Sequence, residues 1–169
     1  MAHGNGCFDA HSDLLYSVVR ERAAGETGVI EDKFLPDMRE GGIGMRVAAV
    51  YLDAEYVPEM SVRRALDIVA AFHEEERETP GIESAETSEA VRAGVESDPV
   101  TLILGMEGAE PLAGDLSLLD VYHRLGVRLL TLTHSRRNAV GDGALFSPEE
   151  TGTPGGLSPF GLDVVERMA

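Results

Sequence analysis

The sequence predicts an α/β fold in which parallel strands form the core and helices cover them. Four short segments are continuously apolar, as strands buried on both faces are, and segments with helical periodicity separate them. The length of 169 residues suits one domain (1–169), which removes roughly two-thirds of its unfolded surface from water. We therefore expect strands and helices to alternate around one hydrophobic core.

The four predicted strands are rich in aliphatic residues and end in polar or turn-forming residues. They span residues 6–10, 45–52 ("MRVAAVYL"), 101–106 ("TLILGM") and 127–133 ("VRLLTLT"). Because these runs show no alternation of apolar and polar residues, we expect parallel strands that are covered on both faces.

Helical periodicity lies between these strands, over residues 13–22, 62–78, 87–93 and 116–125. Asp115 is the expected N-cap of the fourth helix, and Gly126 is the expected stop. A last helix is predicted over 159–169, with Ser158 as N-cap and Pro159 in its first turn. The glycine- and proline-rich segment 151–161 before it is predicted to be a loop within the domain.

The charge balance argues against two classes of partner. Thirty acidic residues against fourteen basic ones give a net charge of −16, and Lys33 is the single lysine. Such a surface repels nucleic acid and anionic membranes, so we expect neither as a partner. The acidity is equally consistent with adaptation to high salt, where repulsion between carboxylates is screened, and with a large margin of solubility.

The cysteine content and the N-terminus constrain the chemistry and the location. Cys7 alone allows no intrachain disulfide and no cysteine-rich zinc site, and its apolar neighbours predict an inert buried thiol. The start "MAHGNGCFDA" lacks the basic and apolar regions of a signal peptide. No segment reaches the roughly 20 apolar residues of a membrane span. We therefore expect a soluble cytoplasmic protein.

Ionisable residues follow three of the four predicted strands. His11 and Asp13 follow the first strand, Glu107 follows the third and His134 follows the fourth. In parallel α/β folds, sites are built at the carboxyl ends of the strands, and residues two apart in an extended segment point the same way. His11 and Asp13 can thus converge on one ion, with Glu107 arriving from another strand. This ligand set suits zinc or manganese.

Each of these residues also has an ordinary structural role that the sequence leaves open. Asp13 can cap the following helix, Glu107 can be a solvated loop acid, and His134 can be a satisfied structural histidine. Their joint occurrence at strand ends favours a shared site over three separate coincidences. No function is assigned to the remaining histidines, which are His3, His73 and His123.

Five segments of the sequence resemble the membrane dipeptidase (renal dipeptidase) family of metallopeptidases. They are "FDAHSDLL", "EGGIGMRVAAVYL", "LILGMEGAEPL", "VYHRLGVRLLTLTHSRRN" and "GGLSPFGLDVVERM", and they follow the family's order along nearly the whole chain. Residues 121–138 are the most specific part. The resemblance implies a (β/α)8 TIM barrel of the amidohydrolase kind, of which this chain would form about the first half.

The resemblance also implies an activity, the hydrolysis of dipeptides at a centre of two divalent metal ions, usually zinc. His11 and Asp13 match the family's metal ligands on the first strand, and Glu107 matches the carboxylate that bridges both ions. A hydroxide shared by the two ions would attack the peptide carbonyl. His134 matches the catalytic, substrate-binding histidine, which would stabilise the charge that develops on the carbonyl oxygen. Related enzymes bridge their metals with a carboxylated lysine, but Lys33 is not at a strand end, which independently favours Glu107.

The same resemblance predicts what this chain lacks. A complete barrel needs about 250 residues, and the family's remaining histidine ligands, its substrate-binding arginine and an aspartate come after the segment that matches residues 161–168. We therefore expect a truncated, amino-terminal half that is inactive alone, with a dipeptide as substrate and a homodimer or a complementing C-terminal half as partner. Two alternatives are a non-catalytic or split-enzyme chain that associates through exposed sheet edges and an intact small protein with one metal ion.

Overall fold

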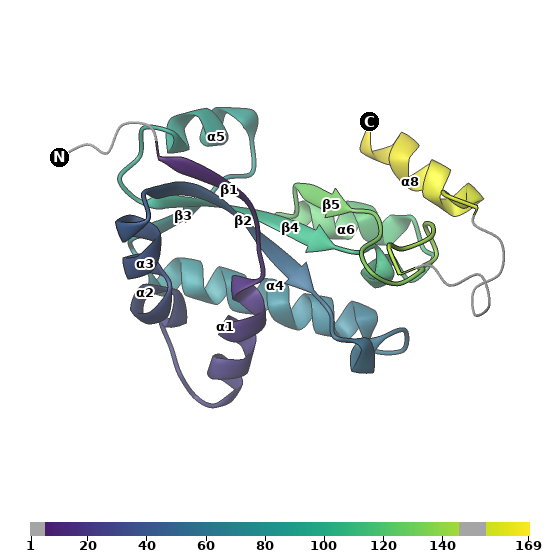
Figure 1. The fold of residues 1–169 in the computed structure, drawn as a ribbon, viewed down its shortest axis with the longest axis horizontal. Coiled ribbons are helices and arrows are strands. Elements are labelled where there is room, and N and C mark those ends of the chain that lie inside the picture. Colours follow the sequence, from purple (N-terminus) through teal and green to yellow (C-terminus); the bar gives the residue numbers. More distant parts are fainter. Residues whose placement is uncertain (1–5, 146–154) are drawn as a thin grey trace.

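The computed structural model describes residues 6–145 and 155–169, and these residues form a parallel α/β half-barrel (Figure 1). The strands are β1 (Cys7–Ser12), β2 (Ile43–Tyr51), β3 (Ile82–Ser84), β4 (Val100–Glu107) and β5 (Leu129–Thr131). The α-helices are α1 (Leu14–Ala23), α2 (Val29–Lys33), α3 (Leu35–Glu40), α4 (Ser61–Glu78), α5 (Ser88–Gly94), α6 (Ser117–Arg124) and α8 (Pro159–Met168). Two short 3-10 helices are η1 (Ala54–Tyr56) and η2 (Glu110–Leu112).

Strand β4 is the centre of the sheet, because it pairs in parallel with β2 on one side and with β3 and β5 on the other. β3 pairs with the amino end of β4 and β5 with its carboxyl end, while β1 lies outside β2. The register sets Tyr51, Glu107 and Thr131 side by side at the carboxyl ends of β2, β4 and β5. This edge of the sheet is therefore the place where side chains from several strands meet.

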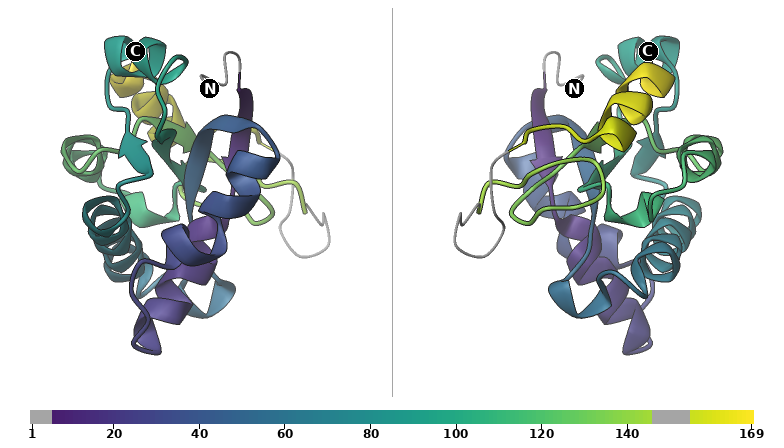
Figure 2. Two further views of the ribbon diagram at one scale, coloured as in Figure 1. Left: turned by 90° about the vertical axis from the view of Figure 1, so that its left-hand side faces the viewer. Right: turned by 90° about the vertical axis from the view of Figure 1, so that its right-hand side faces the viewer.

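The hydrophobic core lies between the sheet and helices α1 to α4. Helix α4 contributes its apolar face, which is almost fully buried, against buried side chains of β2, β4 and α1. The core includes Leu15, Val18, Val50, Ile68, Phe72, Leu102 and Leu104. Figures 1 and 2 show that α8 lies apart from α1, α2 and α3, at the opposite side of the molecule.

All five predicted helices and all four predicted strands occur, with ends shifted by a few residues. Thr87 caps α5 by accepting a hydrogen bond from the Ala90 backbone, and Ser158 caps α8 by accepting one from Gly161. The predicted loop 151–161 lies partly outside the described residues. Strand β3 and helices α2 and α3 were not predicted, because each is too short to show a period.

The predicted burial is right for β2 and β4 and wrong for β1. Strand β1 is mostly exposed, and Phe8 keeps 53% of its surface accessible. Cys7 is also exposed, so the prediction of a buried thiol is wrong. The physical reason is position, since β1 pairs with a strand on one side only and its apolar composition could not reveal that.

An ionic cluster joins α1 and α2 to α4. The Arg22 guanidinium donates to the carboxylates of Glu74, Glu75 and Glu78, and the buried Glu75 also accepts a 2.7 Å hydrogen bond from the Ile30 backbone. The hydrogen bond from Arg22, with a second from the Gly28 backbone, lowers the pKa of Glu78 to about 2. Pairing with these carboxylates raises the pKa of Arg22.

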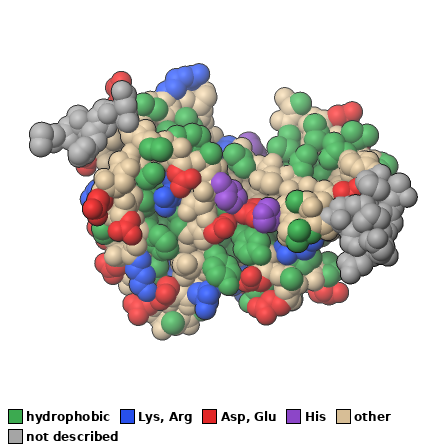
Figure 3. Space-filling model, in the orientation of Figure 1, with side chains coloured by type: hydrophobic (Ala, Val, Ile, Leu, Met, Phe, Trp, Pro, Cys, Tyr) green, Lys and Arg blue, Asp and Glu red, His purple; other side chains and the backbone are tan. Residues whose placement is uncertain are grey.

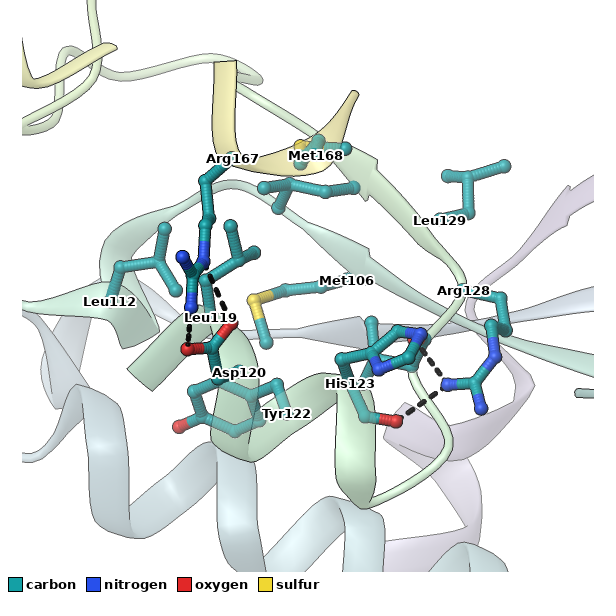
Figure 4. Close-up of a pocket in the computed structure, with 12 residues that line it drawn as sticks. Met106, Leu112, Leu119, Asp120, Tyr122, His123, Arg128, Leu129, Arg167 and Met168 are labelled. Carbon is teal, nitrogen blue, oxygen red and sulfur yellow. Dashed lines mark hydrogen bonds and ion pairs between the residues drawn. The ribbon is translucent and has the colours of Figure 1, made fainter. Parts of the chain in front are cut away.

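The half-barrel is open beside β1 at one side of the sheet, and its other open side lies around β5, α6 and α8 (Figure 4). A cavity of about 440 Å³ is lined there by apolar side chains such as Leu129 and Met168, and an Asp120–Arg167 ion pair crosses it. Leu129 is 38% exposed. Apolar side chains are thus exposed on strands at both outer sides of the sheet, with Phe8 on β1 and Leu129 on β5. Among the described residues, no helix is both long and apolar enough to cross a bilayer.

The Glu78 pKa predicts how acid affects stability. A carboxyl group with a lower pKa in the folded chain than in the unfolded one stabilises the fold above the unfolded value of 4.5, and loses this effect as the pH falls toward 2. We expect Glu78→Gln to lower the free energy of unfolding at pH 6 and to have little effect at pH 2. Denaturant titrations across this range measure the difference, with Glu40→Gln at an exposed position of α3 as the control. A difference independent of pH would contradict the prediction.

Candidate metal centre

The candidate site lies at the carboxyl edge of the sheet, where the sequence predicts it. His11 is near the end of β1, Asp13 follows that strand directly, and Glu107 is the last residue of β4. His134 follows β5 by three residues, in an irregular loop. The pairing of β4 with both β2 and β5 brings these segments together, although 96 residues separate His11 from Glu107 in the sequence.

Three of the predicted residues converge on a common point. His11 Nε2 lies 2.6 Å from Glu107 Oε2 and 3.4 Å from Asp13 Oδ1. One ligand atom from each of these residues lies within 4.8 Å of the other two. One imidazole nitrogen and two carboxylate oxygens at this spacing form a donor set suited to zinc or manganese. The residues therefore fit a divalent cation.

Glu107 is the residue that joins the two halves of the site. Its Oε2 faces His11, and its Oε1 lies 2.9 Å from His134 Nδ1. The Glu107 side chain is only 5% exposed, whereas those of His11 and His134 are 43% and 58% exposed. Each oxygen of one buried carboxylate thus faces a different, accessible imidazole. This arrangement allows the carboxylate to contact a group on the His11 side and a group on the His134 side at the same time.

Figure 3 shows where these groups reach the surface. Histidine and carboxylate side chains gather in the middle of this face, between hydrophobic side chains. The site is therefore open to a small ligand from solvent. The apolar cavity beside α8 is separate, because its lining includes none of His11, Asp13, Glu107 and His134.

The structure shows the surroundings of the three residues for which the sequence leaves an ordinary structural role open. Asp13 occupies the N-cap position of α1, but its side chain makes no capping hydrogen bond and faces His11 instead. Glu107 is buried at a strand end, so it is not a solvated loop acid. His134 is exposed, and its ring contacts Glu107. Asp13 and Glu107 therefore do not have the ordinary structural roles, while the contact of His134 is compatible with both of its roles.

Two of the other histidines, His73 and His123, make hydrogen bonds away from the site, and the third lies outside the described residues. His73 makes a 2.9 Å hydrogen bond to the Leu125 carbonyl and lies 3.6 Å from Glu76. The carbonyl of His123, near the end of α6, accepts a hydrogen bond from Arg128. His3 lies outside the described residues. These positions agree with assigning no function to His73 and His123.

Sequence reasoning missed a network of polar side chains directly beside the site. Arg136 and Asn138 both donate hydrogen bonds to Glu110, and each also donates to a backbone carbonyl, one directly after β2 and the other directly after β5. Glu110 and Arg136 occur within the segments "LILGMEGAEPL" and "THSRRN", but 26 residues separate them. A sequence gives no sign of which acid and which base will pair over such a distance.

Comparison with known proteins shows which family the chain matches. The model of the membrane dipeptidase family (peptidase family M19) matches residues 3–169. Dipeptidase tcpJ of Claviceps purpurea is 36% identical over 87 residues, which are 52% of this chain and 20% of that protein. Dipeptidase verJ of Clonostachys rogersoniana is 30% identical over 118 residues, which are 69% of this chain and 29% of that protein.

Solved structures show the same fold. A dipeptidase described as a metallopeptidase of family M19 has a TM-score of 0.81 at 28% identity, over 97% of this chain and 53% of that one. A metallopeptidase from Rhodobacter sphaeroides, liganded with a phosphinate mimic of the dipeptide L-Ala-D-Ala, has a TM-score of 0.82 at 26% identity, over 97% and 56%. The chain spans about half the length of these solved relatives.

A parallel half-barrel with candidate metal ligands at the carboxyl ends of its strands defines the class of fold as an α/β barrel, the fold of the M19 metallopeptidase that it matches. Within that class, the chain belongs to the membrane dipeptidase family, peptidase family M19. The resemblance stated from the sequence is thereby confirmed, and so is the half-barrel of the TIM type.

The convergence of ligand atoms predicts metal binding by the chain itself. We expect Asp13→Asn to weaken Zn²⁺ binding by more than about tenfold, because it removes a charged donor atom. Loss of a group that only hydrogen-bonds to a metal ligand already lowers metal affinity about tenfold or more. Titration against a chromophoric chelator measures the affinity. Asp53→Asn is the matched control, since Asp53 follows β2 much as Asp13 follows β1. Equal effects of the two substitutions would contradict the assignment of Asp13 as a ligand.

Proposed function

We propose that this chain carries the metal-binding half of a zinc-dependent dipeptidase that hydrolyses the peptide bond of dipeptides. The observation that carries the proposal is the convergence of His11, Asp13 and Glu107 at the carboxyl edge of the half-barrel. Membership of a dipeptidase family supports the same activity. In this proposal His11 and Asp13 would help to hold one cation, and the two oxygens of Glu107 would make it a ligand for that cation and for a second one.

Each residue has a defined role in the proposed reaction. Bound divalent cations would supply Lewis acidity, which acidifies water and polarises a peptide carbonyl. His11 and Asp13 hold their donor atoms on one side of Glu107, and His134 stands on the other side. Because the His134 ring is 58% exposed, it can turn to a substrate and donate a hydrogen bond to the carbonyl oxygen as negative charge develops there.

The proposed substrate is a dipeptide bound at the open face beside His134. The similar metallopeptidase from Rhodobacter sphaeroides is liganded with a phosphinate mimic of the dipeptide L-Ala-D-Ala. Two features of this chain suit a small zwitterionic ligand, namely an accessible carboxylate and imidazole cluster and a neighbouring apolar surface. We extend the proposal to dipeptides whose C-terminal residue has the D configuration.

Activity in this proposal needs more than the described residues. Among residues 6–145 and 155–169, one group of three acidic or histidine side chains has metal-binding geometry. A site for two cations needs further ligands, and the solved relatives contain almost as many residues again beyond the matched part. We therefore propose that full activity requires additional βα units next to β5.

The activity of the isolated chain tests this proposal. We expect the 169-residue chain to bind Zn²⁺ but to hydrolyse L-Ala-D-Ala at a rate at least about a hundredfold below that of a full-length relative, because the second cation has too few ligands. A coupled assay for released D-alanine measures the rate. Turnover within a hundredfold of the relative would show that the described residues suffice, and absence of Zn²⁺ binding would contradict the metal centre itself.

A second candidate function is association with a complementing chain. The exposed Phe8 on β1 and Leu129 on β5, with Leu162 and Met168 on α8, favour it because apolar sheet and helix faces bind other polypeptides. We propose a partner that supplies further βα units of the barrel, with a homodimer as the competing outcome.

Light scattering at increasing chain concentration separates these outcomes. For a chain that needs a complementing partner, we expect a monomer at low concentration and a stable 1:1 complex when the C-terminal half of an M19 relative is added. Leu129→Asp should weaken that complex, since it places a charge on the open strand, whereas Glu40→Gln on α3 should not. A stable dimer of the chain alone would favour the homodimer.

A further inference from the structure

We infer that Glu110, Arg136 and Asn138 form a clamp that fixes the distance between Glu107 and His134, and that these three are positioning residues for the metal centre. The inference deepens the proposed function and rests on it, because it concerns the geometry of the proposed ligands. The clamp residues themselves hold no metal ion in this inference. They act by joining the segments that carry Glu107 and His134.

The clamp ties together the carboxyl ends of three strands. Arg136 Nε donates to Glu110 Oε1 at 3.0 Å, and the same guanidinium donates at 2.6 Å to the carbonyl of Leu52, which follows β2. The Asn138 amide donates at 3.2 Å to Glu110 Oε2 and at 2.9 Å to the carbonyl of Leu132, which follows β5. Both oxygens of Glu110, which follows β4, are therefore used to hold the loop after β5.

The Glu110 carboxylate is buried, and the local backbone makes room for it. Its side chain is 6% exposed, so its charge has little contact with water and depends on Arg136. A Cβ at Gly108 would overlap with the Glu110 carboxylate, and Gly108 has φ +88°, a conformation that favours glycine. Glycine directly after Glu107 thus allows the chain to turn and lay Glu110 back against the end of β4.

The path from the clamp to the site is short. Glu110 is three residues after Glu107, and the backbone of Gly108 donates a 2.9 Å hydrogen bond to Thr131 in β5. Arg136 is two residues after His134, which lies in a loop without regular secondary structure. Within this loop the His134 carbonyl accepts a 2.7 Å hydrogen bond from the Ala144 backbone, which joins the loop only to itself. The clamp ties the loop to the strand ends, and in this inference it keeps His134 Nδ1 2.9 Å from Glu107 Oε1.

Substitutions in the clamp test the inference on the full 169-residue chain with Zn²⁺ as the probe. We expect Glu110→Gln to weaken Zn²⁺ binding about tenfold. This is the lower end of the loss of metal affinity that follows when a residue supporting the metal ligands is substituted. Arg136→Lys keeps the charge but loses the planar fork, so it should weaken binding less. Competition with a chromophoric chelator measures both affinities, and thermal unfolding reports whether each variant is folded.

Arg128→Lys is the matched control. Arg128 also donates to a glutamate, Glu86, and to backbone carbonyls, but it does so at the amino end of β5, away from the site. Its side chain is 22% exposed, close to the 28% of Arg136. We expect this control to lower the melting temperature about as much as Arg136→Lys and to leave Zn²⁺ affinity unchanged. Equal loss of affinity in the two lysine variants, or unchanged affinity in folded Glu110→Gln, would overturn the clamp.

A readout without metal separates failure of the clamp from failure of the proposed function. In the metal-free chain, nuclear Overhauser contacts between the His134 ring and the Glu107 side chain should be present, and they should persist in Arg128→Lys. Their loss in Glu110→Gln, or in Arg136→Lys if the first variant does not fold, would support the clamp even if the unmodified chain binds no Zn²⁺. Their persistence in both clamp variants would refute it.

Discussion

The buried carboxylate of Glu107 is the group on which the candidate site depends. It lies at the end of an apolar strand, with 5% of its side chain exposed, where an unpaired charge would cost several kcal/mol. Imidazoles from two other segments, His11 and His134, approach its two oxygens. The core thus fixes the position of the Glu107 carboxylate. That carboxylate in turn sets the positions at which the more exposed histidines can contribute to the candidate site.

Two kinds of order therefore meet at this edge of the sheet. The strands have rigid positions, because β4 is paired on both sides and its side chains are buried. The loops that follow them have only single backbone hydrogen bonds, such as the one from Gly108 to Thr131, and polar side-chain contacts organise them further, with Glu110 and Arg136 as the central pair. A binding site can combine donor atoms held by strands with side chains held by loops. It can do so here because each loop is tied to a strand end.

Much of the fold could be predicted from local patterns in the sequence. Continuous hydrophobicity identified β2 and β4, helical period identified α4, and polar residues after strands identified His11, Asp13 and Glu107. What could not be predicted depends on partners distant in sequence. The exposure of β1 follows from its place outside β2, and the Glu110–Arg136 pair spans 26 residues. Short elements such as β3 carry too few residues for a period to show.

The order of the candidate ligands along the chain has a consequence for biosynthesis. His11, Asp13 and Glu107 all belong to the part of the chain that ends with β4, and that part also contains β2 and α4. A polypeptide leaving the ribosome therefore carries the complete three-residue cluster before β5 and α8 have been translated. Capture of a cation by the nascent chain would then favour correct strand order early, and would make metal supply a factor in the folding yield.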